Sequence, residues 1–151
     1  MISRFYSRFR QIGDNWKNKK KRSNADFYLC NLMLAFMDKC YEDLYSNVLE
    51  AFKNESEEYY EDSAYYYTIA YEEIKSSGRV NSRLNEVKNY FEKKISKMKY
   101  EDAMTYYNDK YYSTAIDKFK ESINNKYMTY DIKKDCEKKL GQAYEQFAKE
   151  N

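Results

Sequence analysis

Residues 106–123 read YYNDKYYSTAIDKFKESI and hold the pattern that decides the fold. Two tyrosine pairs flank a short polar break, and Ala115 and Phe119 follow four residues apart. Asn108 and Asp109 in the break are typical turn residues, and a four-residue spacing places two side chains on one face of a helix. The stretch therefore predicts two helices joined by a turn. It also raises the question of why a small residue stands at position 115 among so many rings.

The composition of the whole chain favours helices throughout. Proline is absent from the 151 residues and only 3 are glycine, so little in the chain interrupts a helix. A β-sandwich or a dinucleotide-binding fold would need more turn residues. The 19 tyrosines suit thin helical layers with much surface, because a buried tyrosine ring needs a wet edge or a partner for its hydroxyl. We expect an all-α domain at residues 24–151, preceded by a basic N-terminal arm at residues 1–23.

The spacing of apolar residues predicts seven helices. They are expected at Ala25 to Met37, Tyr41 to Phe52, Glu57 to Lys75, Val80 to Ile95, Ser96 to Tyr107, Tyr111 to Asn124 and Asp131 to Lys149. The sequence SSG at Ser76–Gly78 should end the third helix, because glycine commonly stands just past a helix end, and residues 125–129 should form a loop. Short connections imply antiparallel neighbours, so we expect three hairpins followed by a final helix.

The residues around the opening stretch resemble a tetratricopeptide repeat, a helical hairpin that stacks into arrays. Small and aromatic residues stand where that family has them, at Ala103, Tyr106, Tyr112, Ala115, Phe119 and Ser122. The resemblance implies that the small residues let two helices approach closely while the rings fill the space beside them. Leu140, Gly141 and Tyr144 resemble the family's Leu-Gly-x-x-Tyr, and a close helix contact is the expected reason for Gly141.

Upstream the resemblance is weaker. The family's pattern for a second helix is matched in part by Tyr41, Leu44, Val48 and Ala51. The pattern for a first helix is matched by Ala64 and Tyr67, and the pattern for its partner helix by Val80, Leu84, Val87 and Phe91. The family's closing proline is missing. Gly141 follows Ala103 by 38 residues, more than the ~34 of the family, which implies a short insertion near Met128. We expect a short array of about three hairpins capped by the last helix.

In tetratricopeptide arrays the first helix of each hairpin lines a concave groove that binds a partner. The resemblance would place in this groove Glu58, Glu61, Tyr65, Tyr100, Met104, Tyr107, Lys138 and Gln142. Tyrosine and methionine suit recognition, since they bury a large area at low ordering cost. The Lys/Asn arrangement that some members use to hold a terminal carboxylate is absent, which disfavours a receptor for chaperone tails. We expect an interaction or scaffold module that binds a partner peptide or helix.

Charge is unevenly distributed along the chain. Asp14 and Asp26 are the only acidic residues among the first 30, which hold the basic residues Arg4, Arg8, Arg10, Lys17, Lys19, Lys20, Lys21 and Arg22. The stretch from Glu42 to Glu73, by contrast, holds ten acidic residues and a single basic residue, Lys53.

The basic arm has several interpretations. The first thirteen residues have the composition of a mitochondrial transit segment. The arm also fits an anionic membrane surface, nucleic-acid phosphates, a solvated tail or the acidic region at residues 57–62 of its own chain.

Two other classes of function stay open. One is a structural accessory subunit of a larger, mitochondrial or other, assembly that the basic arm anchors to a neighbour. The other is a nucleic-acid-associated protein that uses the arm and the basic residues between Lys75 and Lys99; the lack of a base-reading motif disfavours it.

Enzyme chemistry finds little support in the sequence. The chain has no histidine, hence no histidine base or metal ligand, and no glycine-rich phosphate loop. At helical spacing, the acidic run of Glu57, Glu58, Glu61 and Asp62 spreads over more than half of the helix circumference. This favours a solvated acidic face over a cation site. We expect no catalysis, no metal and no cofactor.

The cysteines and the apolar runs bear on the compartment. Cys30, Cys40 and Cys136 match neither a disulfide framework nor a zinc pattern. We expect them to be buried in packing, in a reducing intracellular compartment, either cytoplasmic or mitochondrial. The longest apolar stretch, at residues 27–37, is about half the ~20 residues of a membrane helix.

Overall fold

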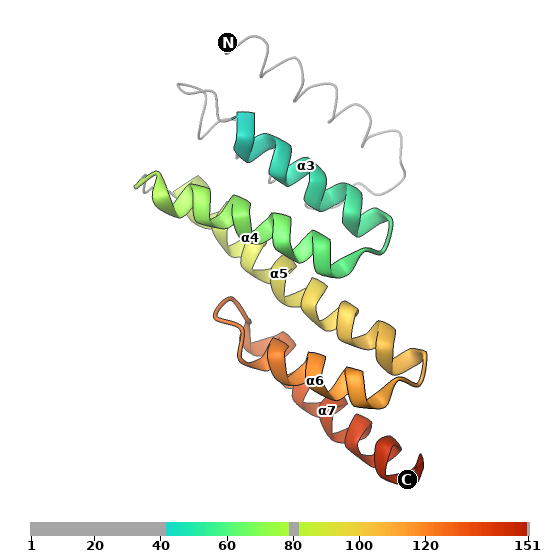
Figure 1. Cartoon of the computed structure of the whole chain (residues 1–151). Coiled ribbons are helices and arrows are strands. Elements are labelled where there is room, and N and C mark those ends of the chain that lie inside the picture. The colour runs from blue at the N-terminus through green and yellow to red at the C-terminus, as the bar shows by residue number, and fades with distance from the viewer. Residues whose placement is uncertain (1–41, 79–81, 151) are drawn as a thin grey trace.

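The computed structural model describes residues 42–78 and 82–150, and all regular structure in them is helical. The helices are α3 (Glu42–Ser56), α4 (Tyr60–Ser76), α5 (Ser82–Asn108), α6 (Tyr112–Ile123) and α7 (Tyr130–Glu150). Each helix packs against the next in an antiparallel sense, and α5 also contacts α7 (Figure 1). The all-α prediction is confirmed for this part of the chain. The helix expected from Ala25, the basic arm, Cys30 and Cys40 lie outside the described residues.

Helix α5 is continuous over 27 residues, so the predicted break between two helices at Ile95–Ser96 is wrong. The Ser96 hydroxyl shares its proton between the carbonyl oxygens of Glu92 (2.9 Å) and Tyr127 (3.0 Å), and it accepts a hydrogen bond from the Thr129 amide (2.8 Å). A serine in a helix can bond the preceding turn in this way without ending the helix. Ser96 therefore attaches the α6–α7 loop to the middle of α5.

The joined helix changes the expected count of three hairpins and a final helix. The N-terminal half of α5 packs with α3 and α4 around Tyr67, Val87, Phe91 and Ile95. Its C-terminal half contributes Ala103 to a second cluster with α6 and α7. One long helix thus serves both neighbours, and Figure 1 shows α3 and α4 on one end of α5 and α6 and α7 on the other.

Two hairpin turns in the structure have the same geometry. In the first, the Glu58 amide donates to the Glu55 carbonyl (3.1 Å) and the Tyr59 amide to the Asn54 carbonyl (2.8 Å). In the second, the amides of Lys110 and Tyr111 donate to the carbonyls of Tyr107 (3.0 Å) and Tyr106 (2.9 Å). This is the Schellman pattern of helix ends. The left-handed residue is Glu58 (φ 63°) or Lys110 (φ 67°), where glycine is usual.

The equivalence extends into the helices on both sides of each turn. Each residue of the second turn lies 52 positions after its counterpart, and the same offset pairs Ala51 with Ala103 and Tyr67 with Phe119. All four of these side chains are fully buried. The resemblance predicts that the helix containing Ala51 is the second helix of a hairpin. The structure instead makes it the first helix of a hairpin with α4.

Small residues stand where the two helices of each hairpin meet. The buried Ser63 hydroxyl of α4 donates to the Ala51 carbonyl of α3 at 2.8 Å, which brings side chain and backbone into direct contact. The same offset relates Ser63 to Ala115, which is fully buried in the cluster that contains Ala103. This packing answers the question that position 115 raised, because a larger side chain there would separate α6 from α5.

Substitution of Ala115 tests this packing. We expect Ala115→Leu to lower the free energy of unfolding by about 1–3 kcal/mol, because added methyl groups strain a close-packed core. The control is Thr114→Leu, one residue away on an exposed position of α6, where the expected change is within about 0.5 kcal/mol. Urea unfolding followed by circular dichroism measures both. Equal effects of the two substitutions would show that Ala115 is not at a close contact.

Two expectations for α7 have different outcomes. Cys136 is fully buried, as predicted, and burial together with Asp135 and Glu137 raises the pKa of its thiol to about 11. The thiol is therefore protonated at neutral pH and acts in packing. The expected close contact at Gly141 is wrong, because a Cβ atom built there would meet nothing within 4 Å. Burial on α7 instead falls on Cys136 and Ala143.

Candidate functional site

Helix α4 has two faces of different character. One face is buried against its neighbours and holds Ser63, Ala64, Tyr67, Ala70 and Ile74. The opposite face lines a pocket of about 540 Å³, here called the α4 groove, formed by Tyr65, Thr68, Ile69, Glu72, Glu73, Ser76 and Ser77. Steps of three and four residues keep these side chains on one side of the helix.

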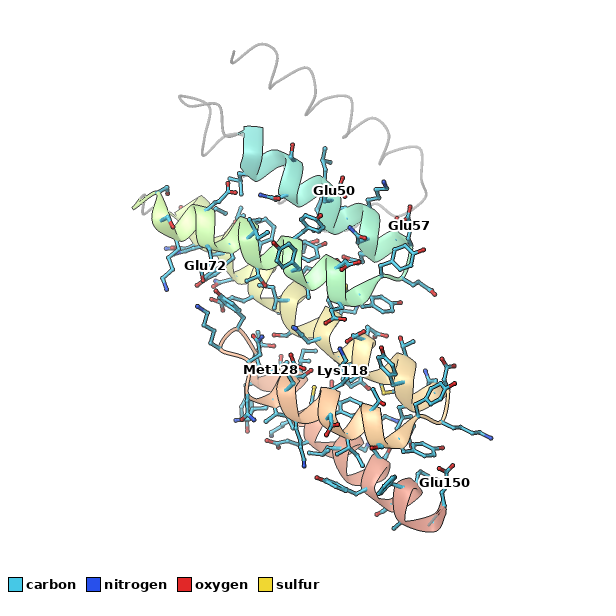
Figure 2. All side chains as sticks on the ribbon, viewed as in Figure 1. Glu50, Glu57, Glu72, Lys118, Met128 and Glu150 are labelled. Carbon is cyan, nitrogen blue, oxygen red and sulfur yellow. The ribbon has the colours of Figure 1, made fainter. Side chains whose placement is uncertain are left out.

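The α4 groove combines an apolar strip with an acidic end. Tyr65 is 61% exposed, its ring meets that of Tyr66 edge-on at a centroid distance of 5.3 Å, and Ile69 is half-buried. Glu72 and Glu73 lie nearer the C-terminal end of α4; Figure 2 shows Glu72 near that end and Glu57 in the turn that precedes the helix. A ligand in the groove would therefore contact an aromatic ring at one end and carboxylates at the other.

Neighbouring elements hold the two carboxylates in position. Glu73 Oε1 accepts a hydrogen bond from Asn47 Nδ2 of α3 at 2.9 Å. Glu72 Oε1 lies 3.3 Å from Lys126 Nζ of the α6–α7 loop, as an ion pair without a hydrogen bond. That oxygen is buried, so the contact with Lys126 holds the Glu72 carboxylate in place. The acidic end of the groove is thus partly preorganised for a positively charged donor.

Three of the predicted groove residues lie at or near α4. Glu58 is exposed in the turn between α3 and α4. Glu61 is exposed in the first helical turn of α4, and Tyr65 lines the α4 groove. Glu61 Oε1 is 3.5 Å from Lys118 Nζ of α6, so its charge is shared with a structural ion pair.

The predicted residues of α5 take part in packing. Tyr100, Met104 and Tyr107 are half-buried against the second cluster, where Leu140 of α7 also packs. The ring of Tyr100 lies 6.2 Å from that of Phe119, and the ring of Tyr107 lies 5.5 Å from that of Tyr112. These side chains support the contact among α5, α6 and α7 whether or not a ligand also reaches them.

The predicted residues of α7 lie apart from α4. Lys138 is exposed and Gln142 is half-buried on α7, which packs on α6 and α5. The described residues thus place the predicted site in two regions, one around α4 and one at the α5–α7 contact. The arm residues Arg4, Arg8, Arg10, Lys19, Lys20, Lys21 and Arg22 lie outside the described part of the chain.

The prediction missed most of the α4 groove, namely Thr68, Ile69, Glu72, Glu73, Ser76 and Ser77. A signal for them was present, since they follow Tyr65 at steps of three and four residues along one helix. The resemblance directed attention to the helices expected to be first in each hairpin. It gave no reason to continue along α4 to its C-terminal end.

A polar network joins three helices beside the first core. The hydroxyl of the buried Tyr67 donates to Glu55 Oε1 at 2.7 Å, and Lys94 Nζ lies 2.8 Å from Glu55 Oε2. Burial and then the nearby Glu55 carboxylate raise the pKa of Tyr67 well above its ordinary value. One carboxylate of α3 thus holds one side chain each from α4 and α5.

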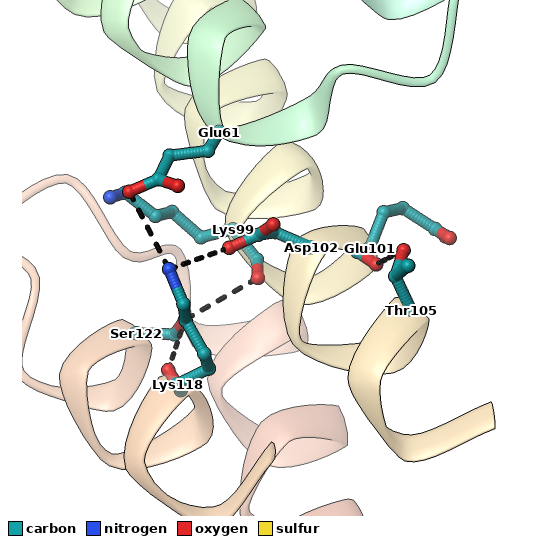
Figure 3. A network of polar contacts seen from close by, with 7 residues as sticks. All are labelled: Glu61, Lys99, Glu101, Asp102, Thr105, Lys118 and Ser122. Carbon is teal, nitrogen blue, oxygen red and sulfur yellow. Dashed lines mark hydrogen bonds and ion pairs between the residues drawn. The ribbon is translucent and has the colours of Figure 1, made fainter. Parts of the chain in front are cut away.

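A second network surrounds Lys118, which reaches from α6 to α5 and α4 (Figure 3). Its ammonium lies 3.2 Å from Asp102 Oδ2 and 3.5 Å from Glu61 Oε1. Burial raises the pKa of Asp102 more than Lys118 lowers it. Burial alone would lower the pKa of Lys118, but Asp102 and Glu61 together raise it. Lys118 is therefore held charged, while Asp102 carries a net cost for its own charge.

Other kinds of site find no support in residues 42–78 and 82–150. No three residues among their cysteines, aspartates and glutamates gather in a way that could hold a metal ion. None of the helices α3 to α7 is long and apolar enough to cross a membrane.

Comparison of the chain with protein-family models, with curated proteins and with solved structures finds no significant match in any of the three.

Proposed function

We propose that this protein is a non-catalytic interaction module that binds a peptide or helix of a partner protein along the α4 groove. The observation that carries the proposal is this groove, in which an exposed tyrosine and an isoleucine lie beside two positioned carboxylates. Apolar grooves with a few placed polar groups are the usual form of a peptide-binding site. The preferred partner segment would combine apolar side chains with lysine or arginine.

The arrangement of the helices supports the same function. Two hairpins share a turn geometry and a set of buried small and aromatic residues, as the helical repeats that bind peptides do. The resemblance to tetratricopeptide repeats fits this arrangement. The 27-residue α5 and the 52-residue offset both exceed the family's dimensions.

The proposal gives different roles to the two regions that the sequence singled out. Tyr65 and the acidic end of α4 would contact the partner. Tyr100, Met104 and Tyr107 would mainly hold the α5–α7 contact, because they are already half-buried.

Selection from a displayed library of random peptides on the full chain, followed by fluorescence polarisation with an enriched peptide, tests the proposal. Enriched peptides should carry basic residues next to apolar ones. Tyr65→Lys should weaken binding by about tenfold or more, because it removes the ring that contacts the apolar side chains of the partner and introduces a charge of the same sign as the partner's basic residues.

The matched control is Tyr130→Lys, which introduces the same residue at a tyrosine 69% exposed on α7. Binding should be unchanged in this variant. A peptide whose affinity responds equally to both substitutions, or to neither, would show that the α4 groove is not the binding surface.

A further inference from the structure

The chain enters the described structure beside the acidic end of the α4 groove. Helix α3 begins at Glu42 and runs antiparallel to α4, which ends at Ser76 (Figure 1). The hydrogen bond from Asn47, near the start of α3, to Glu73, near the end of α4, fixes this alignment. The 41 residues that precede α3 are therefore attached next to Glu72 and Glu73.

The charges on the two sides of this attachment are opposite. Residues 1–22 hold eight lysines and arginines against Asp14 alone. Residues 42–76 hold ten aspartates and glutamates against Lys53 and Lys75. Two segments of opposite sign on one chain attract each other at ordinary ionic strength, where the Debye length is about 8–10 Å.

One part of the arm also matches the apolar strip of the groove. The segment WKNKKKR, at residues 16–22, places the single tryptophan of the chain directly before five basic residues. The indole can pack on Tyr65 and Ile69 while lysine ammonium groups approach the carboxylates of Glu72 and Glu73, which Lys126 and Asn47 hold in position. In the groove and in the segment alike, an aromatic group is followed along the chain by charged groups.

The length of the intervening chain permits this contact. Arg22 precedes Glu42 by 20 residues, which span about 30 Å as a helix and more when extended. The groove from Tyr65 to Ser76 is only about 16 Å long at the helical rise per residue. A tether of this length holds the segment at an effective concentration of order millimolar, so that even a weak contact is populated.

We propose that residues 16–22 of the chain occupy the α4 groove and act as an internal competitor of the partner segment. This inference rests on the proposed function only for the use of the groove as a binding surface. A partner must displace the segment. The apparent affinity of the partner is therefore its intrinsic affinity multiplied by the fraction of chains in which the groove is free.

Fluorescence of Trp16 tests the occupancy in the full chain without any partner. In the proposed state Trp16 is shielded from acrylamide and emits at shorter wavelength than free tryptophan. Tyr65→Lys should abolish this protection, because it removes the ring on which Trp16 packs and places a positive charge beside the basic segment, and Tyr130→Lys should leave the protection unchanged. Salt near 1 M, where the Debye length falls to about 3 Å, should weaken the protection in the unsubstituted chain.

Charge reversal of the arm gives a second readout. The triple substitution Lys19→Glu, Lys20→Glu and Lys21→Glu should remove the protection of Trp16 and raise the affinity for a library-selected peptide. Circular dichroism confirms that each variant keeps its helices.

Three results would overturn the intramolecular occupancy. One is a Trp16 that is already accessible in the full chain. Another is protection that persists in both Tyr65→Lys and the triple variant, which would place Trp16 elsewhere. The third is protection that depends on protein concentration, which would identify the groove of a second copy as the site. Each of these results leaves the peptide-binding test of the groove unaffected, so the two proposals fail separately.

Discussion

Replacing Tyr67 with alanine is expected to lower the free energy of unfolding by about 3–5 kcal/mol, as large-to-small substitutions of buried aromatic residues do. The Tyr67 side chain is fully buried, and its ring lies 5.8 Å from the rings of both Phe52 and Phe91. The substitution would leave a cavity where α3, α4 and α5 meet. It would also remove the hydroxyl that donates to Glu55.

The matched control for this prediction is Tyr65→Ala, two residues away on the same helix. Tyr65 is 61% exposed, so its loss should change stability by no more than about 0.5 kcal/mol. Urea unfolding monitored by circular dichroism compares the two variants. Similar midpoints for both would contradict the assignment of the two faces of α4.

The Tyr67 hydroxyl also makes a specific contribution to the pH dependence. Because the pKa of Tyr67 is raised in the folded state, the folded protein retains a proton that the unfolded chain loses above about pH 10. Stability should therefore fall as the pH rises above this value. Tyr67→Phe should make that fall less steep, and a fall of unchanged steepness would indicate that other groups cause it.

Replacing Lys118 with methionine is expected to cost about 2 kcal/mol of stability at neutral pH, below the range for fully buried pairs because some solvent reaches this one. The side chains of Lys118 and Asp102 are only 22% and 16% exposed, so the substitution would leave a largely buried carboxylate without its ammonium partner. Burial already holds the pKa of Asp102 above its ordinary value, and the loss of Lys118 would raise it further.

The sign of the pH dependence distinguishes this cause from simple loss of packing. A carboxyl group with a raised folded-state pKa destabilises the protein when it is ionised, and the cost disappears as falling pH protonates it. The deficit of Lys118→Met should therefore shrink in acid, and the added substitution Asp102→Asn should recover most of it at neutral pH. A deficit that is equal at pH 7 and in acid would argue for packing instead.

The helical fold was predictable because its signals are local. The absence of proline, the spacing of apolar residues and the SSG stop at Ser76–Gly78 are all read within one or two helical turns. The split of α5 at Ser96 was wrong because the role of that serine depends on Tyr127 and Thr129, about 30 residues away. The tertiary partners of a polar side chain do not show in a local pattern.

The same limit applied to the turns and to the candidate site. The two turns place Glu58 and Lys110 in the left-handed conformation, in which glycine is the usual residue, so the sequence does not mark these positions. Their equivalence shows only when the chain is compared with itself at an offset of 52 residues. The resemblance placed Tyr65 among the expected groove residues, and its ring is 61% exposed. The acidic end of its groove depends on Asn47 and Lys126, which approach from other elements.

The central claim is that the α4 groove is where this protein binds a partner segment. Its most direct test is a titration of the ¹⁵N-labelled full chain with a library-selected peptide, followed by amide chemical shifts. We expect saturable shifts concentrated on Tyr65, Ile69, Glu72 and Ser76, with little change on α7. Shifts that concentrate on α6 and α7 while α4 stays unchanged would contradict the claim.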